Sequence, residues 1–219
     1  MSDRQKQFIT DNTVVMSPPL VPEVRLHLAE ESLPIWRKTE EELGEIDVAP
    51  PFWAFAWAGG QALARYLLDN PQIISGRTVL DIGSGSGLVA IAAAVAGARP
   101  VIANDTDTFA VAALHMNAAL NGISLEVDNR DLLAAGFVGG EAEVICLADV
   151  FYERALGAAA LRFLDAAQSA NRVVLAGDPQ RHYFPAARFD VIARYAVAVT
   201  RELEDSEIKR AAVWALKPR

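Results

Sequence analysis

The amino-acid sequence predicts an α/β fold built on an open, mostly parallel sheet with helices on both faces. A short apolar run at residues 79–82 leads into a glycine-rich turn and then an Ala-rich segment, which is the order strand, tight turn, helix. Further apolar runs and helical patterns alternate along the chain. Near the C-terminus, residues 189–200 and 208–216 alternate like an antiparallel pair around the polar turn 201–207.

Composition restricts the class of protein. The 219 residues, 52% of them hydrophobic, suit one domain with a substantial core and a short N-terminal extension. A formal net charge of −8 opposes nucleic-acid binding. Cys146 is the single cysteine, so an internal disulfide and a Cys-cluster metal site are excluded. The longest apolar run, residues 88–98, is too short for a membrane span, which needs ~20 residues, and no secretory or Arg-rich leader is evident. We therefore expect a cytoplasmic monomer that binds no metal, membrane or nucleic acid.

Before the sheet, the chain divides into three segments. Residues 1–20 are polar and Pro-rich, which indicates a mobile arm. Residues 24–28 alternate as a short strand with His27 on its solvent face. Ser32 and Pro34 start an expected helix that ends at Gly44.

An aromatic stretch follows at residues 50–61. Two prolines stop regular structure, four aromatic residues follow within six positions, and Gly59-Gly60 opens a helix that ends at Asn70-Pro71. These rings are either core or binding groups. Trp53 and Trp57 are the better candidates for a site, because a sulfonium or ammonium cation favours the face of an aromatic ring.

The remaining elements alternate between strand and helix. The expected parallel strands are residues 77–82, 100–104, 124–127, 143–148 and 172–176, and the expected helices between them are 86–96, 110–121 and 155–167.

The glycine-rich turn indicates a nucleoside cofactor. Gly83, Gly85 and Gly87 permit positive φ and let a ligand lie against bare backbone, next to the free N–H groups of the following helix. Residues 85–90 also satisfy the dinucleotide fingerprint G-x-G-x-x-A, so the glycines alone leave NAD open. Asp81 argues against NAD, because a carboxylate at the strand tip repels pyrophosphate. It suits the ammonium of S-adenosylmethionine (SAM), which has no phosphate.

The pattern D-x-G-x-G-x-G, from Asp81 to Gly87, resembles the first motif of the Rossmann-like, seven-strand, SAM-dependent methyltransferases. The resemblance implies a seven-strand methyltransferase domain at residues 59–219, preceded at 1–58 by an extension that covers substrate and cofactor. The cofactor-binding residues that we expect are Trp57, Asp81, Gly83, Ser84, Gly85, Gly87, Asp105, Asp131 and Leu132.

Two carboxylates in that set have competing interpretations. Asp105 follows the second strand, where a carboxylate accepts both ribose hydroxyls, but it could instead cap the next helix, as Thr106 or Asp107 could. The resemblance assigns Asp131 to the adenine amino group and Leu132 to the face of the ring. The alternative for Asp131 is a turn residue that caps a short helix.

The tip of the fourth strand carries Asp149-x-x-Tyr152 and no proline, which resembles the protein-lysine methyltransferases rather than the enzymes that methylate DNA or glutamine. We expect Asp149, Tyr152 and Trp53 to be catalytic: Asp149 holds the acceptor lysine, while the two rings shape its channel. Asp149→Ala should then abolish most methylation and leave SAM affinity and melting temperature near wild type. The alternative is that Asp149 caps the helix near Arg154.

A fuller resemblance covers about residues 20–216. Residues 22–28, 51–71 and 149–153 look like the family of lysine methyltransferases that act on the electron transfer flavoprotein β subunit. Ala58 replaces a proline of that family, and we interpret it as a bacterial-type variation. The resemblance implies a protein substrate, namely that β subunit. The alternatives are ribosomal-protein lysines, another amine, or an NAD-binding oxidoreductase.

Overall fold

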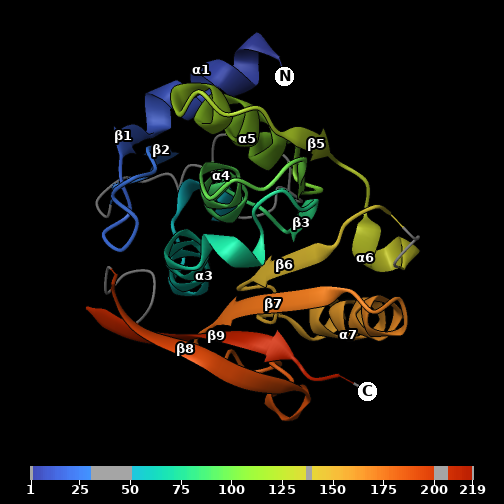
Figure 1. The fold of residues 1–219 in the computed structure, drawn as a ribbon. Coiled ribbons are helices and arrows are strands. Elements are labelled where there is room, and N and C mark those ends of the chain that lie inside the picture. Colours follow the sequence, from blue (N-terminus) through green and yellow to red (C-terminus); the bar gives the residue numbers. More distant parts are fainter. Residues whose placement is uncertain (1, 31–50, 137–139, 200–206, 219) are drawn as a thin grey trace.

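The computed structural model describes residues 2–30, 51–136, 140–199 and 207–218. Its centre is a seven-stranded sheet in the order β5-β4-β3-β6-β7-β9-β8 (Figure 1). The first five strands in that order are parallel, and β9 runs antiparallel between β7 and β8. The predicted mostly parallel sheet with a terminal hairpin is thus confirmed. The strands are β3 (Val79–Ile82), β4 (Val101–Asn104), β5 (Glu126–Asp128), β6 (Val144–Ala148), β7 (Val173–Asp178), β8 (Phe189–Ala198) and β9 (Ile208–Leu216).

Helices cover both faces of this sheet. One face packs against α3 (Ala58–Asp69), α4 (Leu88–Val95) and α5 (Thr108–Leu120), and the other against α6 (Leu132–Ala135) and α7 (Arg154–Ser169). Successive strand residues point to opposite faces: Val79 joins the first core and Leu80 the second. Short 3-10 turns η1 (Phe52–Ala54), η2 (Pro71–Ile73) and η3 (Ala186–Arg188) connect these elements.

The strand order places a crevice between β3 and β6. From β3 the chain moves outward to β4 and β5, then returns to form β6 on the other side of β3. In an open α/β sheet a ligand binds outside the carboxyl ends of the strands at such a switch point. The glycine-rich turn follows β3 and Asp149 follows β6, so the topology brings both to this crevice.

The prediction of a mobile arm at residues 1–20 is wrong. This segment contains α1 (Asp3–Asn12), which begins with a capping box between Ser2 and Gln5, and β1 (Val14–Met16), which pairs with β2 (Leu26–Leu28). The helix lies along α5 (Figure 1), where Ile9 is fully buried and the ring of Phe8 packs 5.1 Å from that of Phe109.

Strand β2 also differs from its expected environment. His27 is half-buried rather than on a solvent face, its Nδ1 lies 3.2 Å from Thr13 Oγ1, and burial lowers its pKa. Val24 and Leu26 join the core that contains α3 and α4. The boundary at residue 58 between an N-terminal extension and the methyltransferase domain stays a prediction. The helix expected at 32–44 and residues 201–206 of the expected turn lie outside the described residues. No helix in the described part of the chain is long and apolar enough to cross a membrane.

Candidate active site

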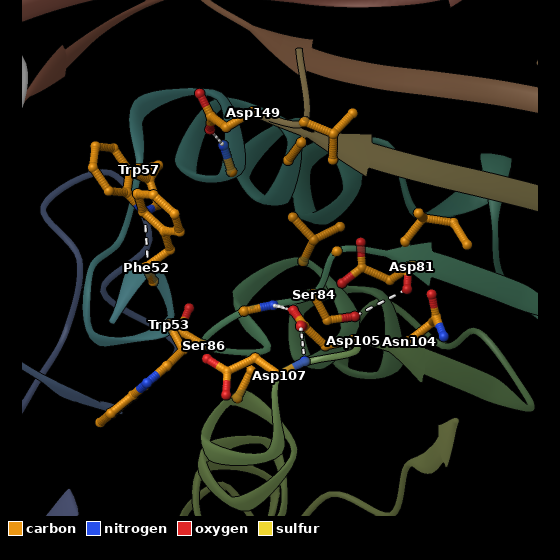
Figure 2. A pocket seen from close by; sticks show the side chains of 18 of the residues that line it. Phe52, Trp53, Trp57, Asp81, Ser84, Ser86, Asn104, Asp105, Asp107 and Asp149 are labelled. Carbon is orange, nitrogen blue, oxygen red and sulfur yellow. Dashed lines mark hydrogen bonds between the residues drawn. The ribbon is translucent and has the colours of Figure 1, made fainter. Parts of the chain in front are cut away.

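A cavity of about 380 Å³ lies at the carboxyl ends of β3, β4 and β6 (Figure 2). The structure brings all the predicted site residues except Gly87 to its wall. They are Trp53, Trp57, Asp81, Gly83, Ser84, Gly85, Asp105, Asp131, Leu132, Asp149 and Tyr152. Their individual roles stay predictions, and the geometry around each one bears on them.

The glycine-rich turn requires its glycines. Gly83, Gly85 and Gly87 have φ values of 66°, 52° and 83°, a region that side chains rarely adopt. Gly87 is the N-cap of α4, and a Cβ on it would lie 2.8 Å from Leu114 Cδ2. It therefore sets the close packing of α4 rather than the cavity wall. Ser84 closes the turn, because its Oγ donates to the carbonyl of Asp81 at 2.9 Å.

Asp81 has a buried carboxylate, and one of its oxygens has no hydrogen-bond donor among the described residues. Its residue is 1% exposed, and its Oδ2 has no hydrogen-bond partner among the described residues. Burial raises the pKa of Asp81 to about 7, and repulsion from Asp105 adds to this rise. An ammonium group would supply both the missing donors and the missing charge. The site therefore fits the ammonium end of SAM.

Asp105 does not cap α5, which was the alternative interpretation of this residue. Its Oδ2 accepts from Gly85 N at 2.8 Å and its Oδ1 from Asp107 N at 3.0 Å. The cap of α5 is Asp107, whose Oδ1 accepts from Phe109 N at 2.8 Å. Burial raises the pKa of Asp105. Asp105 thus fixes the glycine-rich turn and still presents its carboxylate to the cavity (Figure 2).

Asp131 is both a helix cap and part of the cavity wall. It caps α6, because its Oδ1 accepts from Ala134 N at 2.8 Å, and it also lines the cavity beside the half-buried Leu132. Asn104 holds the preceding loop in place by donating from Nδ2 to the carbonyls of Asp128 and Arg130, both at 2.8 Å.

Asp149 is bound from two sides. It follows β6 in the left-handed region, with φ 56°, and its side chain is 9% exposed. Its Oδ2 accepts from Gly60 N at 2.9 Å, at the start of α3. Its Oδ1 accepts from Arg181 Nε at 2.9 Å and lies 2.7 Å from Arg181 Nη2. Asp149 therefore caps α3, whereas the N-cap of α7 is Glu153 with no side-chain bond.

Arg181 is a site residue that the sequence does not single out. It lies in the loop after β7, and its Cζ is 5.4 Å from the centre of the Trp57 ring, a cation–π distance. The Trp57 indole in turn donates from Nε1 to the carbonyl of Phe52 at 2.9 Å. Arg181 therefore joins Asp149 to the aromatic wall of the cavity.

The other two predicted catalytic residues have different surroundings. Tyr152 is 45% exposed at the rim, with its ring 5.2 Å from that of Phe52. Trp53 is 2% exposed and stacks on Phe109 at 6.4 Å, with its ring directed away from Asp149 (Figure 2). Tyr152 therefore lines the same cavity as Asp149, whereas the Trp53 ring packs in a buried cluster.

Two glycines bring α3 against β7 beside Asp149. A Cβ on Gly59 would overlap the carbonyl oxygen of Gly177, and a Cβ on Gly177 would overlap that of Gly59. This approach puts the first N–H groups of α3 within reach of Asp149. In the described part of the chain, no group of three or more His, Cys, Asp or Glu residues could hold a metal ion.

The family model of the ribosomal protein L11 methyltransferases matches residues 62–153. Curated relatives match much more of the chain. The electron transfer flavoprotein β-subunit lysine methyltransferase of Xenopus laevis is 37% identical over 97% of this chain and 87% of its own length. The human protein of that name is 34% identical over 97% of this chain and 82% of its own length.

Solved structures share the fold. The magnesium protoporphyrin IX methyltransferase of Synechocystis, with bound SAM, aligns with a TM-score of 0.54 at 19% identity, over 84% of this chain and 90% of its own. The ribosomal protein L11 methylase of Lactobacillus delbrueckii aligns with a TM-score of 0.50 at 22% identity, over 72% and 78%. These likenesses bear on the fold alone.

The prediction of a bacterial, cytoplasmic protein is wrong on this comparison. The frog, fish and human relatives match over most of the chain, and all three are animal proteins.

Proposed function

Because the chain belongs to the family of electron transfer flavoprotein β-subunit lysine methyltransferases, we propose that this SAM-dependent methyltransferase transfers methyl groups to lysine side chains of that β subunit. The observation that carries the proposal is the 37% identity to the frog enzyme over 97% of the chain. The cavity supports it, since its carboxylates suit a cation-bearing cofactor and a cationic acceptor.

The cofactor half of the proposed site consists of carboxylates around the glycine-rich turn. SAM, when bound, supplies a methyl group on a positively charged sulfur. We assign its ammonium group to Asp81, whose buried Oδ2 lacks a donor, its ribose to Asp105, and its adenine to Asp131 and Leu132. An NAD pyrophosphate would instead meet repulsion from Asp81.

The acceptor half lies between Asp149 and the rim. Methyl transfer needs an uncharged lysine nitrogen in line with the methyl group, with no covalent enzyme intermediate. An ordinary lysine pKa of ~10.4 means that the neutral form costs about 4–5 kcal/mol at pH 7. Asp149 is a positioning group, because a carboxylate is a weak base toward ammonium. Tyr152 narrows the approach to it, and residues 1–58 supply the aromatic wall through Trp57.

The test of the proposal is an assay with defined substrates. The purified chain is incubated with radiolabelled SAM and, separately, with the electron transfer flavoprotein β subunit and ribosomal protein L11. We expect the label on the β subunit, with mass spectrometry placing it on lysine. The L11 methyltransferase model, which matches 62–153, makes L11 the informative competitor. Label on L11 alone, or on neither protein, would contradict the proposed substrate.

Replacing Asp105 should separate cofactor binding from helix capping. Asp105→Ala is expected to weaken binding of S-adenosylhomocysteine (SAH) by roughly 1.5–3 kcal/mol, since charge-assisted bonds and the anchor of Gly85 are lost together. Asp107→Ala removes the true cap of α5 and should cost about 1 kcal/mol of stability. Calorimetric titration and thermal melting measure the two effects. Unchanged SAH affinity in Asp105→Ala would remove Asp105 from the cofactor site.

A further inference from the structure

A carboxylate beside the acceptor lysine creates an electrostatic problem, given the proposed function on which this inference rests. The reaction needs the neutral amine, but a nearby negative charge favours the ammonium form and raises the pKa of the lysine. Asp149 alone would therefore hold the substrate in its unreactive state. The structure places a permanent cation on that carboxylate.

The ion pair between Arg181 and Asp149 is short and largely removed from water. Arg181 Nε and Nη2 lie 2.9 and 2.7 Å from Asp149 Oδ1, and the two side chains are 18% and 9% exposed. The guanidinium also lies over the Trp57 ring, and both charged residues line the cavity. An arginine keeps its charge at every pH that an enzyme meets. The pair therefore contributes no net charge to the acceptor half of the site.

We propose that Arg181 is a positioning residue that neutralises Asp149, so that the site orients the acceptor lysine without stabilising its ammonium form. The carboxylate keeps its direction, with one oxygen on α3 and the other on the guanidinium. The bound lysine loses its proton to solvent more readily than it would beside a lone carboxylate.

Two further properties of the loop support this role. Gln180, directly before Arg181, has φ 64°, so both partners of the pair belong to segments with left-handed backbone. Such conformations cluster where the surrounding structure enforces a functional geometry. Asp178 fixes the loop, because its Oδ1 accepts from Arg181 N at 2.6 Å.

Other titratable groups lie around the pair. Asp178 at the end of β7 has a pKa raised to about 7 by burial and by the charge of Asp149. Tyr152, His182 and Lys209 line a second cavity together with Arg181, and burial raises the pKa of Tyr152. Asp178 therefore needs a control of its own.

The reaction moves one methyl group and one positive charge from sulfur to nitrogen. The ammonium of the bound lysine first releases one proton to water. The lysine nitrogen then gives its lone pair to the methyl carbon, the carbon–sulfur bond breaks, and its electron pair stays on sulfur. The products are a methylated ammonium and SAH. Arg181 acts on the first of these events, because the charge beside the bound lysine sets the pKa of that lysine.

The test compares variants that change the charge at positions 149 and 181. The quantity measured is the pH dependence of kcat, whose rising limb reports the pKa of the essential group in the enzyme–substrate complex. The assay uses the β subunit and saturating SAM, and Arg181→Gln removes the positive charge that pairs with Asp149. Its limb should move up by about one pH unit, which lowers kcat at pH 7 about tenfold while the loss shrinks at high pH. Arg181→Lys keeps the charge and should keep the limb. The double variant Asp149→Asn/Arg181→Gln restores zero net charge, so its limb should return toward wild type even though its plateau is low.

Controls separate charge from folding. Arg188→Gln breaks another arginine–aspartate pair, with Asp165 at 2.8 Å, and should leave the profile unchanged. Asp178→Asn, added to each variant, removes the titration of Asp178. A uniform loss at every pH in Arg181→Gln would overturn the proposal, as would an unmoved limb. If Arg181→Gln does not melt cooperatively, the limb of the charge-balanced double variant decides, and a large shift there contradicts the proposal. Wild-type enzyme that labels no β subunit would instead refute the proposed function.

Discussion

Asp149→Asn is expected to lower the high-pH plateau of kcat by about 100-fold, the scale of loss that follows when a reacting group is misplaced by about 1 Å. The amide can still accept from Gly60 N but cannot pair with the Arg181 guanidinium, so the side chain loses one of its two fixed directions. Affinity for SAH should not change, because the proposed cofactor contacts are made by other residues. Steady-state assays with calorimetry measure both quantities.

The same variant should also melt at a lower temperature. Arg181 would remain largely buried without its counter-charge, at a cost of roughly 1.5–3 kcal/mol. This differs from the unchanged melting temperature expected from the sequence, because the sequence does not reveal that Asp149 caps α3. Asp165→Asn is the matched control, since it removes a carboxylate from an exposed pair. Normal turnover in Asp149→Asn together with lowered melting would show that Asp149 is structural only.

Asp81→Asn is expected to have opposite effects on binding and on stability. SAH affinity should fall by roughly 1.5–3 kcal/mol, because the amide cannot offer charge to the ammonium. The free protein should become more stable above pH 7. In the wild type the folded pKa of Asp81 is about 7 against an ordinary 3.8, so ionising this group in the fold costs up to ~4 kcal/mol.

The upward shift of the Asp81 pKa determines the pH range over which stability changes. A raised folded pKa contributes stability that is present below pH 3.8 and is lost as pH rises toward 7. Ligand-free wild type should therefore lose this contribution between pH 4 and 7, and SAH should restore most of it. Asp178→Asn is the control: its pKa is also about 7, yet it does not belong to the cavity wall. It should change stability in the same direction and leave SAH affinity unchanged. Equal SAH affinities of Asp81→Asn and wild type would contradict the ammonium assignment.

The sequence predicts the parts of the site that local patterns encode. Glycines at every second position after an apolar run specify a tight turn, and carboxylates at the ends of parallel strands reach one edge of a sheet wherever the strands pair. Asp81 and Asp105 could be placed on the cavity wall by these two arguments. The capping interpretation of Asp105 could be rejected only once Asp107 was seen to occupy the cap.

What the sequence could not predict depends on pairing between distant segments. Arg181 and Asp149 are 32 residues apart and no periodicity relates them, so only the packed fold identifies the pair. The capped helix α1 had a readable signal, Ser2 followed by Gln5 three residues later, but its mostly polar residues suggested a mobile arm. Trp53 lies in a buried stack because Phe109, from a distant helix, supplies its partner.

The contact between Gly59 and Gly177 restricts how this sequence can change. Each carbonyl occupies the place that a Cβ of the other residue would need, so neither position can gain a side chain first and be compensated by the other later. Even alanine at either position would push α3 away from β7 and carry the Gly60 N–H away from Asp149. Single substitutions at either position should therefore be selected against. Variants selected for new acceptors should retain glycine at both positions.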